Sequence, residues 1–250
     1  MTAPIIILHR RNYSEQISDL PRGGWIEIDV DCLDGMACVS HDPATKEAMP
    51  EPLSVFIPRA LEKGVAGFVF DCKRENVEKA VQPIIARYGI TNYFYLNEME
   101  IQGDICLARD AAHRTALRIW RYRPARDLIR YAEEMKAASQ PAPGWAWIDC
   151  WQRELAADIG KPFLPINQAD AHRLQRLGVK LCVCSPELYM HNYEKTYEPI
   201  DLENIYRSVV RYRQRLMQTG VATDAVCTKF PRLWMLDADE LLASENLNVV

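Results

Sequence analysis

Acidic and imidazole side chains follow or interrupt three short apolar runs in the first part of the sequence. His9 follows the first run, Glu27 and Asp29 lie within the second, and Asp71 ends the third. Carboxylates are ligands that hard divalent cations such as Mg²⁺ or Ca²⁺ prefer, and an imidazole transfers protons near neutral pH. These residue types together predict a cation site with a proton-transfer group beside it.

The spacing of Glu27 and Asp29 gives both side chains the same direction. Residues two apart in a strand face one side of it, whereas Ile26, Ile28 and Val30 face the other side and can pack against helices. Two carboxylates in a confined space repel each other unless a cation or a proton neutralises one of them. We therefore expect a divalent cation here; the alternative, an exposed edge strand with solvated acids, is disfavoured by the apolar neighbours.

These groups meet only if the fold gathers the ends of several strands. Eight apolar, β-prone runs predict strands at Pro4–His9, Trp25–Val30, Gly67–Lys73, Tyr93–Leu96, Ala116–Trp120, Trp145–Asp149, Lys180–Cys184 and Ala225–Thr228. Helical spacing predicts helices at Leu53–Lys63, Glu75–Tyr88, Arg126–Ser139, Ala169–Leu177 and Leu202–Thr219, and a short one around Ser14–Leu20. Pro43–Pro52 contains three prolines and is expected to be a loop.

Predicted strands alternate with predicted helices, and most of the longer helices are followed by glycine. This pattern predicts an α/β fold of the (β/α)8 TIM-barrel type. At 250 residues the chain fits one such domain, spanning residues 1–250. Barrels of this kind place their chemistry at the carboxyl ends of the strands. Further polar residues at those ends are candidates for substrate contact: Asn97, Arg121, Asp149, Trp151, Glu187 and Lys229.

The composition of the chain argues against some classes of binding partner. A formal charge of −4 without a long basic cluster argues against nucleic acid, and no run of 18 apolar residues predicts a membrane span. The eight cysteines lie mostly in apolar runs without a Cys-x-x-Cys pair, so we expect reduced thiols rather than zinc ligands or disulfides. With no basic segment before the first apolar run, the expected location is the cytoplasm. The oligomeric state is not predicted.

The order of the polar motifs resembles the glycerophosphodiester phosphodiesterase family. The matching segments are His9-Arg10, Glu27-Ile-Asp29, Asp34-Gly35, His41-Asp42 and Asp71-Cys-Lys73, with a fainter match at Cys227-Thr228-Lys229-Phe-Pro231. The strong similarity covers about the first third of the chain. It implies a barrel of the phosphatidylinositol phospholipase C-like type and a metal-dependent hydrolase of a glycerophosphodiester or a related small phosphodiester.

The resemblance also implies roles for individual residues. Glu27, Asp29 and Asp71 would hold the metal ion, Mg²⁺ or Ca²⁺. His9 and His41 would form the acid–base pair, whereas Arg10 and Lys73 would bind the phosphate oxygens. Trp151 is an additional candidate for substrate contact at a strand end.

Several positions differ from the family pattern. Arg11 stands where the family usually has glycine, Asp71 stands where glutamate is more usual, and the family's Glu-Asn-Thr signature is absent. Sphingomyelinase D relatives share the aspartate at the third acidic position. The segment between His41 and Asp71 is too short for the family's small insertion subdomain.

Three other functions fit parts of the sequence. A catalytically degenerate barrel that binds a phosphorylated ligand would account for the departures from the family motif. A barrel lyase or aldolase could use Lys73 or Lys229 as a Schiff-base amine, but it would leave the histidines and acids without a task. A scaffold protein is the broadest alternative, and a metal-binding measurement would distinguish it from the metal-dependent hydrolase.

Overall fold

The computed structural model describes residues 3–17, 19–46, 50–74, 76–97, 113–119, 124–150, 164, 166–189 and 202–237. Eight parallel strands form a closed barrel in the order β1, β10, β9, β8, β7, β6, β5, β2, which the pairing of β1 with β2 closes. They are β1 (Ile5–Leu8), β2 (Trp25–Leu33), β5 (Gly67–Cys72), β6 (Tyr93–Asn97), β7 (Thr115–Ile119), β8 (Trp145–Ile148), β9 (Lys180–Cys184) and β10 (Ala225–Thr228).

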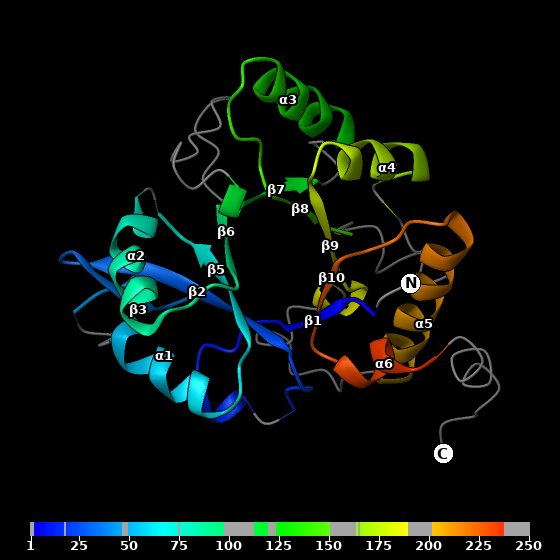
Figure 1. The fold of residues 1–250 in the computed structure, drawn as a ribbon. Helices are drawn as coiled ribbons and strands as arrows, with labels where there is room; N and C mark the ends of the chain where they lie inside the picture. Colours follow the sequence, from blue (N-terminus) through cyan, green and yellow to red (C-terminus); the bar gives the residue numbers. More distant parts are fainter. Residues whose placement is uncertain are drawn as a thin grey trace.

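The helices lie outside this ring of strands (Figure 1). They are α1 (Leu53–Glu62), α2 (Val77–Tyr88), α3 (Ala125–Ala137), α4 (Gln168–Arg176), α5 (Leu202–Thr219) and α6 (Pro231–Met235), with 3₁₀ turns η1 (Ser14–Gln16) and η3 (Pro186–Leu188). The predicted TIM-type barrel is confirmed, although the helix expected around Ser14–Leu20 is only the turn η1. Gly89 ends α2 in the left-handed conformation, with φ of 62°, as the sequence pattern predicts.

A hairpin that the sequence reading missed extends β2 beyond the barrel. The strand continues past Val30, and β3 (Met36–Val39) returns antiparallel to it. Asp34 and Gly35 have φ of 51° and 81°, the left-handed backbone that a two-residue hairpin turn requires. β4 (Glu51–Pro52) pairs with β3, so the expectation of a loop through Pro52 is wrong at its last two residues. This hairpin brings the segment after β3 back beside β2.

The two faces of each barrel strand pack against different cores. Ile26, Ile28 and Val30 belong to the outer core between strands and helices, as their spacing predicts. Trp25, on the opposite face of β2, belongs to a separate core inside the barrel. The buried members of this inner core are Ile7, Trp25, Val69, Phe94, Leu96, Ala116, Trp145, Trp147, Cys182, Cys184, Ala225 and Cys227. Glu27 and Asp29 share the face of Trp25 and therefore point into the barrel.

Four aromatic side chains pack together inside the barrel, and we call them the aromatic floor: Trp25, Phe94, Trp145 and Trp147. The first three lie near the amino ends of their strands, and Trp147 is the next inward residue of β8. The rings of Phe94 and Trp145 stack with centroids 4.6 Å apart, and Trp25 lies 6.2 Å from each of them. Gly67 makes room for this packing, because a Cβ there would lie 2.3 Å from the Trp25 ring. The floor closes one end of the barrel interior with apolar surface.

Charged side chains occupy the interior above the floor, toward the carboxyl ends of the strands. We call this set the polar layer: Glu27, Asp29, Asp71, Lys73, Arg118 and Asp149. Glu27 and Asp29 lie on β2, Asp71 lies on β5, and Arg118 lies on β7. Lys73 directly follows β5, and Asp149 directly follows β8. The candidate site therefore stands on a packed apolar base and faces the mouth of the barrel.

Candidate functional site

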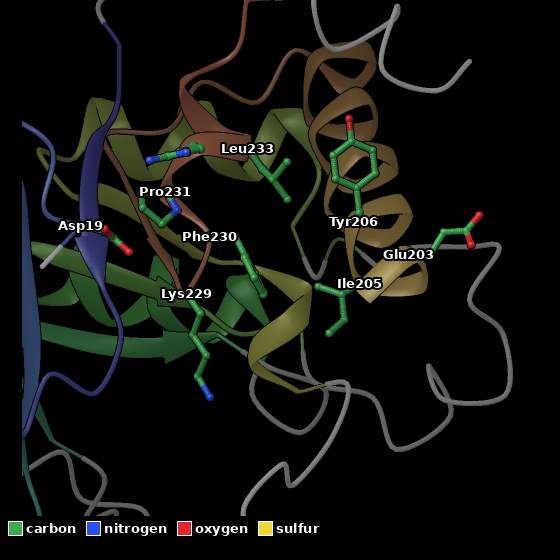
Figure 2. Close-up of a pocket in the computed structure, with 9 residues that line it drawn as sticks. Asp19, Glu203, Ile205, Tyr206, Lys229, Phe230, Pro231 and Leu233 are labelled. Atoms are coloured by element: carbon green, nitrogen blue, oxygen red, sulfur yellow. The ribbon is translucent and has the colours of Figure 1, made fainter. Parts of the chain in front are cut away.

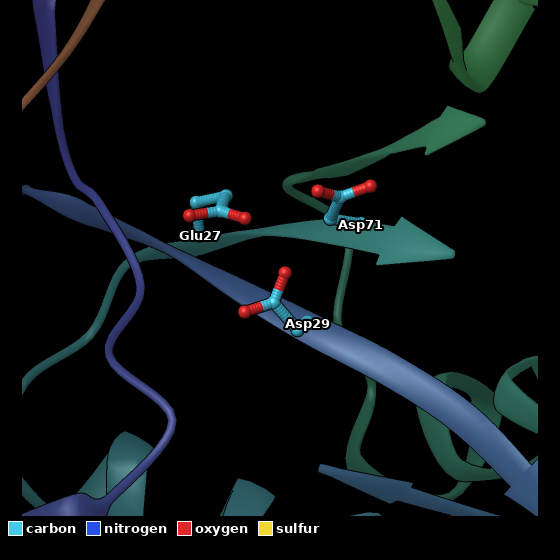
Figure 3. A group of neighbouring side chains, drawn as sticks. All are labelled: Glu27, Asp29 and Asp71. Carbon is cyan, nitrogen blue, oxygen red and sulfur yellow. The ribbon is translucent and has the colours of Figure 1, made fainter. Parts of the chain in front are cut away.

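Three carboxylates from neighbouring strands converge in the polar layer (Figure 3). Asp29 on β2 and Asp71 on β5 are register partners, and Glu27 lies two residues before Asp29 on the same face. Their residues are buried, with exposed fractions of 1% for Glu27, 0% for Asp29 and 4% for Asp71. One oxygen from each lies within 4.8 Å of the others. The sequence placed these three acids together, and the structure brings them together.

The segment after β1 wraps over two of these carboxylates. Arg10 has a left-handed backbone, with φ of 48°, and its amide donates to Glu27 Oε2 at 2.7 Å. The next amide, of Arg11, donates to the Glu27 carbonyl oxygen at 2.9 Å. Asn12 then makes two hydrogen bonds with Asp29: its Nδ2 donates to Oδ2 at 2.7 Å, and its Oδ1 accepts from the Asp29 amide at 2.9 Å. Glu27 and Asp29 are thus fixed in orientation by the β1–β2 loop.

Lys73 supplies much of the positive charge beside the acids. Its Nζ lies 2.8 Å from Asp29 Oδ1 and 2.7 Å from Asp71 Oδ2, and only 12% of its side chain is exposed. Arg10 is more distant, with Nε 3.8 Å from Asp29 Oδ2. Because buried carboxylates require a nearby cation, these contacts explain how two of the three acids are accommodated in the interior.

Glu27 has a weaker charge partner than the other two acids. Burial raises the pKa of Glu27 well above its usual value, and the charges of Asp29 and Asp71 raise it further. The hydrogen bond from the Arg10 amide and the charge of Lys73 lower that pKa, but they do not outweigh the other causes. The surroundings of Glu27 therefore disfavour its charged form, a cost that a further cation beside it would offset.

His9 lies at the end of β1 beside the acidic cluster. Its Nε2 is 3.7 Å from Glu27 Oε2, and 15% of its side chain is exposed. Burial lowers the pKa of His9 well below its usual value, and the charges of Arg10, Lys229 and Lys73 lower it further. Its Nδ1 is buried and has no hydrogen-bond partner among the described residues. A neutral imidazole in this position has an unused nitrogen with which to accept or hold a proton.

His41, the second predicted histidine, is more exposed than His9. The amide of Ser40 donates to the carbonyl oxygen of Asp29 at 3.1 Å, so the chain after β3 returns beside the site. The His41 side chain is 42% exposed, and its Nδ1 lies 3.2 Å from Asp42 Oδ1. In the described part of the chain, its polar contact is with Asp42 rather than with the acidic cluster. The catalytic role of His41 stays a prediction.

A second group of charged residues extends the polar layer across the barrel. Arg118 on β7 donates from Nη1 to Asp149 Oδ2 at 3.1 Å, and its Nη2 lies 3.8 Å from Asp71 Oδ2. Tyr189 donates its hydroxyl proton to the other oxygen of Asp149. Two protein groups thus hold the buried carboxylate of Asp149, and its contact with a substrate stays a prediction. Arg118 links this pair to the acidic cluster.

The end of β10 is tied to the turn after β9 by a buried acid. Glu187 Oε1 accepts hydrogen bonds from Thr228 Oγ1 at 2.5 Å and from the Lys229 amide at 2.9 Å. Its Oε2 is buried without a hydrogen-bond partner among the described residues. Burial raises the pKa of Glu187, although the hydrogen bonds oppose that rise. Glu187 thus holds the start of the β10–α6 segment in place.

Two of the substrate-contact candidates, Trp151 and Arg121, lie outside the described residues, and Asn97 is described only by its backbone in β6. Two contributors were absent from the candidates read from the sequence, Asn12 and Arg118. Asn12 lies in an irregular loop without a strand pattern. Arg118 could have been found, because it is a charge two residues after Ala116 in an otherwise apolar strand and so shares its inward face.

The donor set fits a hard divalent cation. Three carboxylates with one oxygen each within 4.8 Å of the others provide the oxygen ligands that such a cation prefers. The amide of Arg10 orients the Glu27 carboxylate and Asn12 orients that of Asp29, as outer hydrogen bonds commonly do for metal ligands. Lys73 already lies against two of the three acids, so a bound cation would share or displace these ion pairs.

The comparisons with known proteins give no family: no protein-family model matches the sequence, and neither does any curated protein. None of the described helices is long and apolar enough to cross a membrane. The seven described cysteines are free thiols, in line with the expectation from their spacing.

Proposed function

We propose that this protein is a metal-dependent phosphodiester hydrolase, built on a barrel of the phosphatidylinositol phospholipase C-like type. The observation that carries the proposal is the convergence of three buried carboxylates with a largely buried histidine beside them. The ordered resemblance to glycerophosphodiester phosphodiesterases supports the same function, and it favours a glycerophosphodiester or a related small phosphodiester as substrate.

Glu27, Asp29 and Asp71 would hold the cation, Mg²⁺ or Ca²⁺, through oxygen. When bound, such an ion polarises a phosphoryl oxygen and offsets the negative charge that develops there. Asn12 would keep the Asp29 carboxylate oriented toward the cluster through the two hydrogen bonds described above. The aromatic floor beneath keeps water from reaching these charges from the opposite end of the barrel.

His9 is suited to accept a proton from the attacking hydroxyl group. Its lowered pKa leaves the imidazole neutral at pH 7, the form that a general base requires. His41 is the proposed partner that protonates the leaving oxygen, and its exposed ring stands on the loop after β3. The nucleophile is either water or a hydroxyl of the substrate, the latter giving a cyclic phosphate as the first product.

Arg10 and Lys73 are the proposed phosphate-binding cations. The guanidinium of Arg10 is 37% exposed by side chain and lies at the edge of the cluster, where it can present two donors to phosphate oxygens. Lys73 is more buried and has two roles, since the same ammonium also compensates Asp29 and Asp71.

The test is a panel of small phosphodiesters assayed with Mg²⁺, Ca²⁺ or Mn²⁺ and with a chelator. Hydrolysis that requires the cation and disappears in Asp29→Asn supports the proposal. The matched control is Asp34→Asn, an exposed acid in the hairpin turn after β2, where asparagine tolerates the left-handed backbone. Cation binding by calorimetry should be lost in the first variant and kept in the second. Equal cation affinity in both would refute the metal site.

One observation favours the alternative of a barrel that binds a phosphorylated ligand without turnover. Lys73 Nζ forms ion pairs with two of the three carboxylates, so part of the charge of the cluster is offset by a protein side chain, as in a structural charge network. In that case the chelator has no effect, and no member of the panel is hydrolysed. Binding of inorganic phosphate that Arg10→Ala weakens would then identify the ligand-binding barrel.

A further inference from the structure

A cavity of about 440 Å³ lies beside the mouth of the barrel, between α5 and the segment that joins β10 to α6 (Figure 2). Its apolar lining comes from the first turns of α5, from α6 and from the residue before α6: Ile205, Tyr206, Phe230, Pro231 and Leu233. Lys229 and three further charged residues complete it. A volume of this size is typical of small-molecule sites, which are mostly apolar with a few placed polar groups.

Lys229 connects this cavity to the proposed active site. It follows directly after β10, so it stands at the carboxyl end of the barrel. The amide of His9 donates to the carbonyl oxygen of Thr228 at 3.1 Å, which places the two strand ends side by side. A molecule whose phosphate lies near His9 therefore has Lys229 beside it and the apolar cavity beyond.

The wall of the cavity nearest the site is held in place. Glu187 accepts hydrogen bonds from the Thr228 hydroxyl and from the Lys229 amide. The amide of Phe230 in turn donates to Thr228 Oγ1 at 2.9 Å. Because each of three successive residues is fixed by these bonds, the turn from β10 into α6 has a defined shape. The cavity is thus bounded by a supported wall, which favours a formed binding site.

We propose that this cavity binds the apolar part of the phosphodiester, an alkyl or acyl chain of one of its alcohols, while Lys229 contacts the phosphate. The proposal rests on the proposed hydrolase function and adds the substrate class to it: a phosphodiester with a hydrocarbon substituent. The apolar lining would bury methylene groups, and the adjacent cation would hold the anionic end. The phosphate of such a substrate would contact the Lys229 ammonium, and its hydrocarbon chain would contact the apolar lining.

The direct test measures binding of methyl, butyl and octyl phosphate to the whole protein by calorimetry in buffer with Mg²⁺. These monoesters contain no phosphodiester bond, so the measurement does not depend on turnover. Affinity should rise about fourfold for each methylene group that enters the cavity, which is the gain expected for burying one such group. Equal affinity for methyl and butyl phosphate would overturn the proposal.

Two variants separate the apolar and the anionic contacts. Leu233→Trp places a larger side chain in the lining and should abolish the preference for butyl over methyl phosphate. Its matched control is Met235→Trp on the same helix, because Met235 is 61% exposed and does not line the cavity. Lys229→Gln should weaken methyl and butyl phosphate by the same factor. If Leu233→Trp keeps the full chain-length preference, the chain binds elsewhere and the proposal fails.

A parallel assay of phosphodiesters with methyl and butyl substituents distinguishes this inference from the proposed function. If neither is hydrolysed but butyl phosphate still binds more tightly in the wild type than in Leu233→Trp, the cavity assignment stands and the hydrolase proposal falls. If both are hydrolysed with the same kcat/KM and both monoesters bind equally, the cavity assignment alone is wrong.

Discussion

The barrel interior contains two layers of opposite character on the same strands. The aromatic floor uses the inward positions near the amino ends, and the polar layer uses the next inward positions along β2 and β8. Trp25 is followed two residues later by Glu27, and Trp147 by Asp149. On each of these strands, an aromatic ring and a buried carboxylate are thus only two residues apart.

The difference between the layers shows what each contributes. The floor is stabilised by burial of apolar area and by ring contacts, both of which depend on shape. The polar layer is expensive to bury, and each of its acids needs a specific partner such as Lys73, Asn12 or Arg118. Changes in the floor should therefore act on stability, whereas changes in the polar layer should act on chemistry and cation binding.

The largest expected effect is the loss of a floor residue. Trp145→Ala removes a buried ring that stacks on Phe94 and should lower the free energy of unfolding by about 3–5 kcal/mol. Urea denaturation measures this change, and the loss should be the same with and without added Mg²⁺. The control is Tyr13→Ala, where an aromatic ring that is 65% exposed is removed with little effect. A floor variant of wild-type stability would contradict the comparison.

The next largest effect concerns His9 in the region of the polar layer. His9→Ala should reduce turnover by a factor on the order of 10² or more, because it removes the proposed general base. The folded protein should be little affected, since the Nδ1 of His9 makes no hydrogen bond among the described residues. Turnover of the best phosphodiester and the urea midpoint are the two measurements.

The pH profile sharpens the same prediction. A base whose pKa is lowered keeps its neutral form to lower pH, so the acid limb attributed to His9 should lie below pH 6.5, the usual value for histidine. This limb should vanish in His9→Ala. His41→Ala should change the alkaline limb instead, if the exposed histidine is the proton donor. Unaltered turnover in His41→Ala would leave His9 as the single proton-transfer group.

Periodicity accounts for what could be predicted from the sequence. Glu27 and Asp29 were placed inside a barrel because residues alternate along a strand, and the eight apolar runs fixed the strand order that brings Asp71 beside Asp29. Asp34-Gly35 matches both a family motif and a two-residue hairpin turn, so the family resemblance alone does not predict the hairpin. Contacts made by loops and long side chains have no such period. Asn12 reaches Asp29 through the left-handed turn at Arg10, which no spacing indicates.

Asn12 gives the third prediction, of intermediate size. Asn12→Ala removes both hydrogen bonds that orient Asp29, so cation affinity should fall by a factor of about 10 to 100, the usual effect of losing an outer contact to a metal ligand. Calorimetry on chelator-treated protein measures the change. Asn167→Ala is the control, because that residue caps α4 and should affect stability without affecting cation affinity. Unchanged affinity in Asn12→Ala would show that Asp29 is held by strand geometry alone.

The smallest expected effect lies at Glu187, at the rim of the barrel. Its folded-state pKa is raised above the value of 4.5 expected for an unfolded chain, chiefly by burial. Between these two values the folded protein binds more protons than the unfolded one, so the contribution of Glu187 to stability is greatest at low pH and falls as pH rises. Glu187→Gln should remove this fall while keeping an acceptor oxygen for Thr228 and for the Lys229 amide.

Thr228→Val changes the same quantity in the opposite direction. Without the hydroxyl donor, which lowers the pKa of Glu187, that pKa should rise further, and the loss of stability should extend to higher pH. Urea unfolding of the two variants and the wild type between about pH 4 and 8 would measure the three slopes, each proton contributing at most about 1.4 kcal/mol per pH unit. Identical slopes in all three proteins would mean that water or an ion compensates Glu187. The rim would then resemble the compensated acids of the polar layer more than the apolar floor.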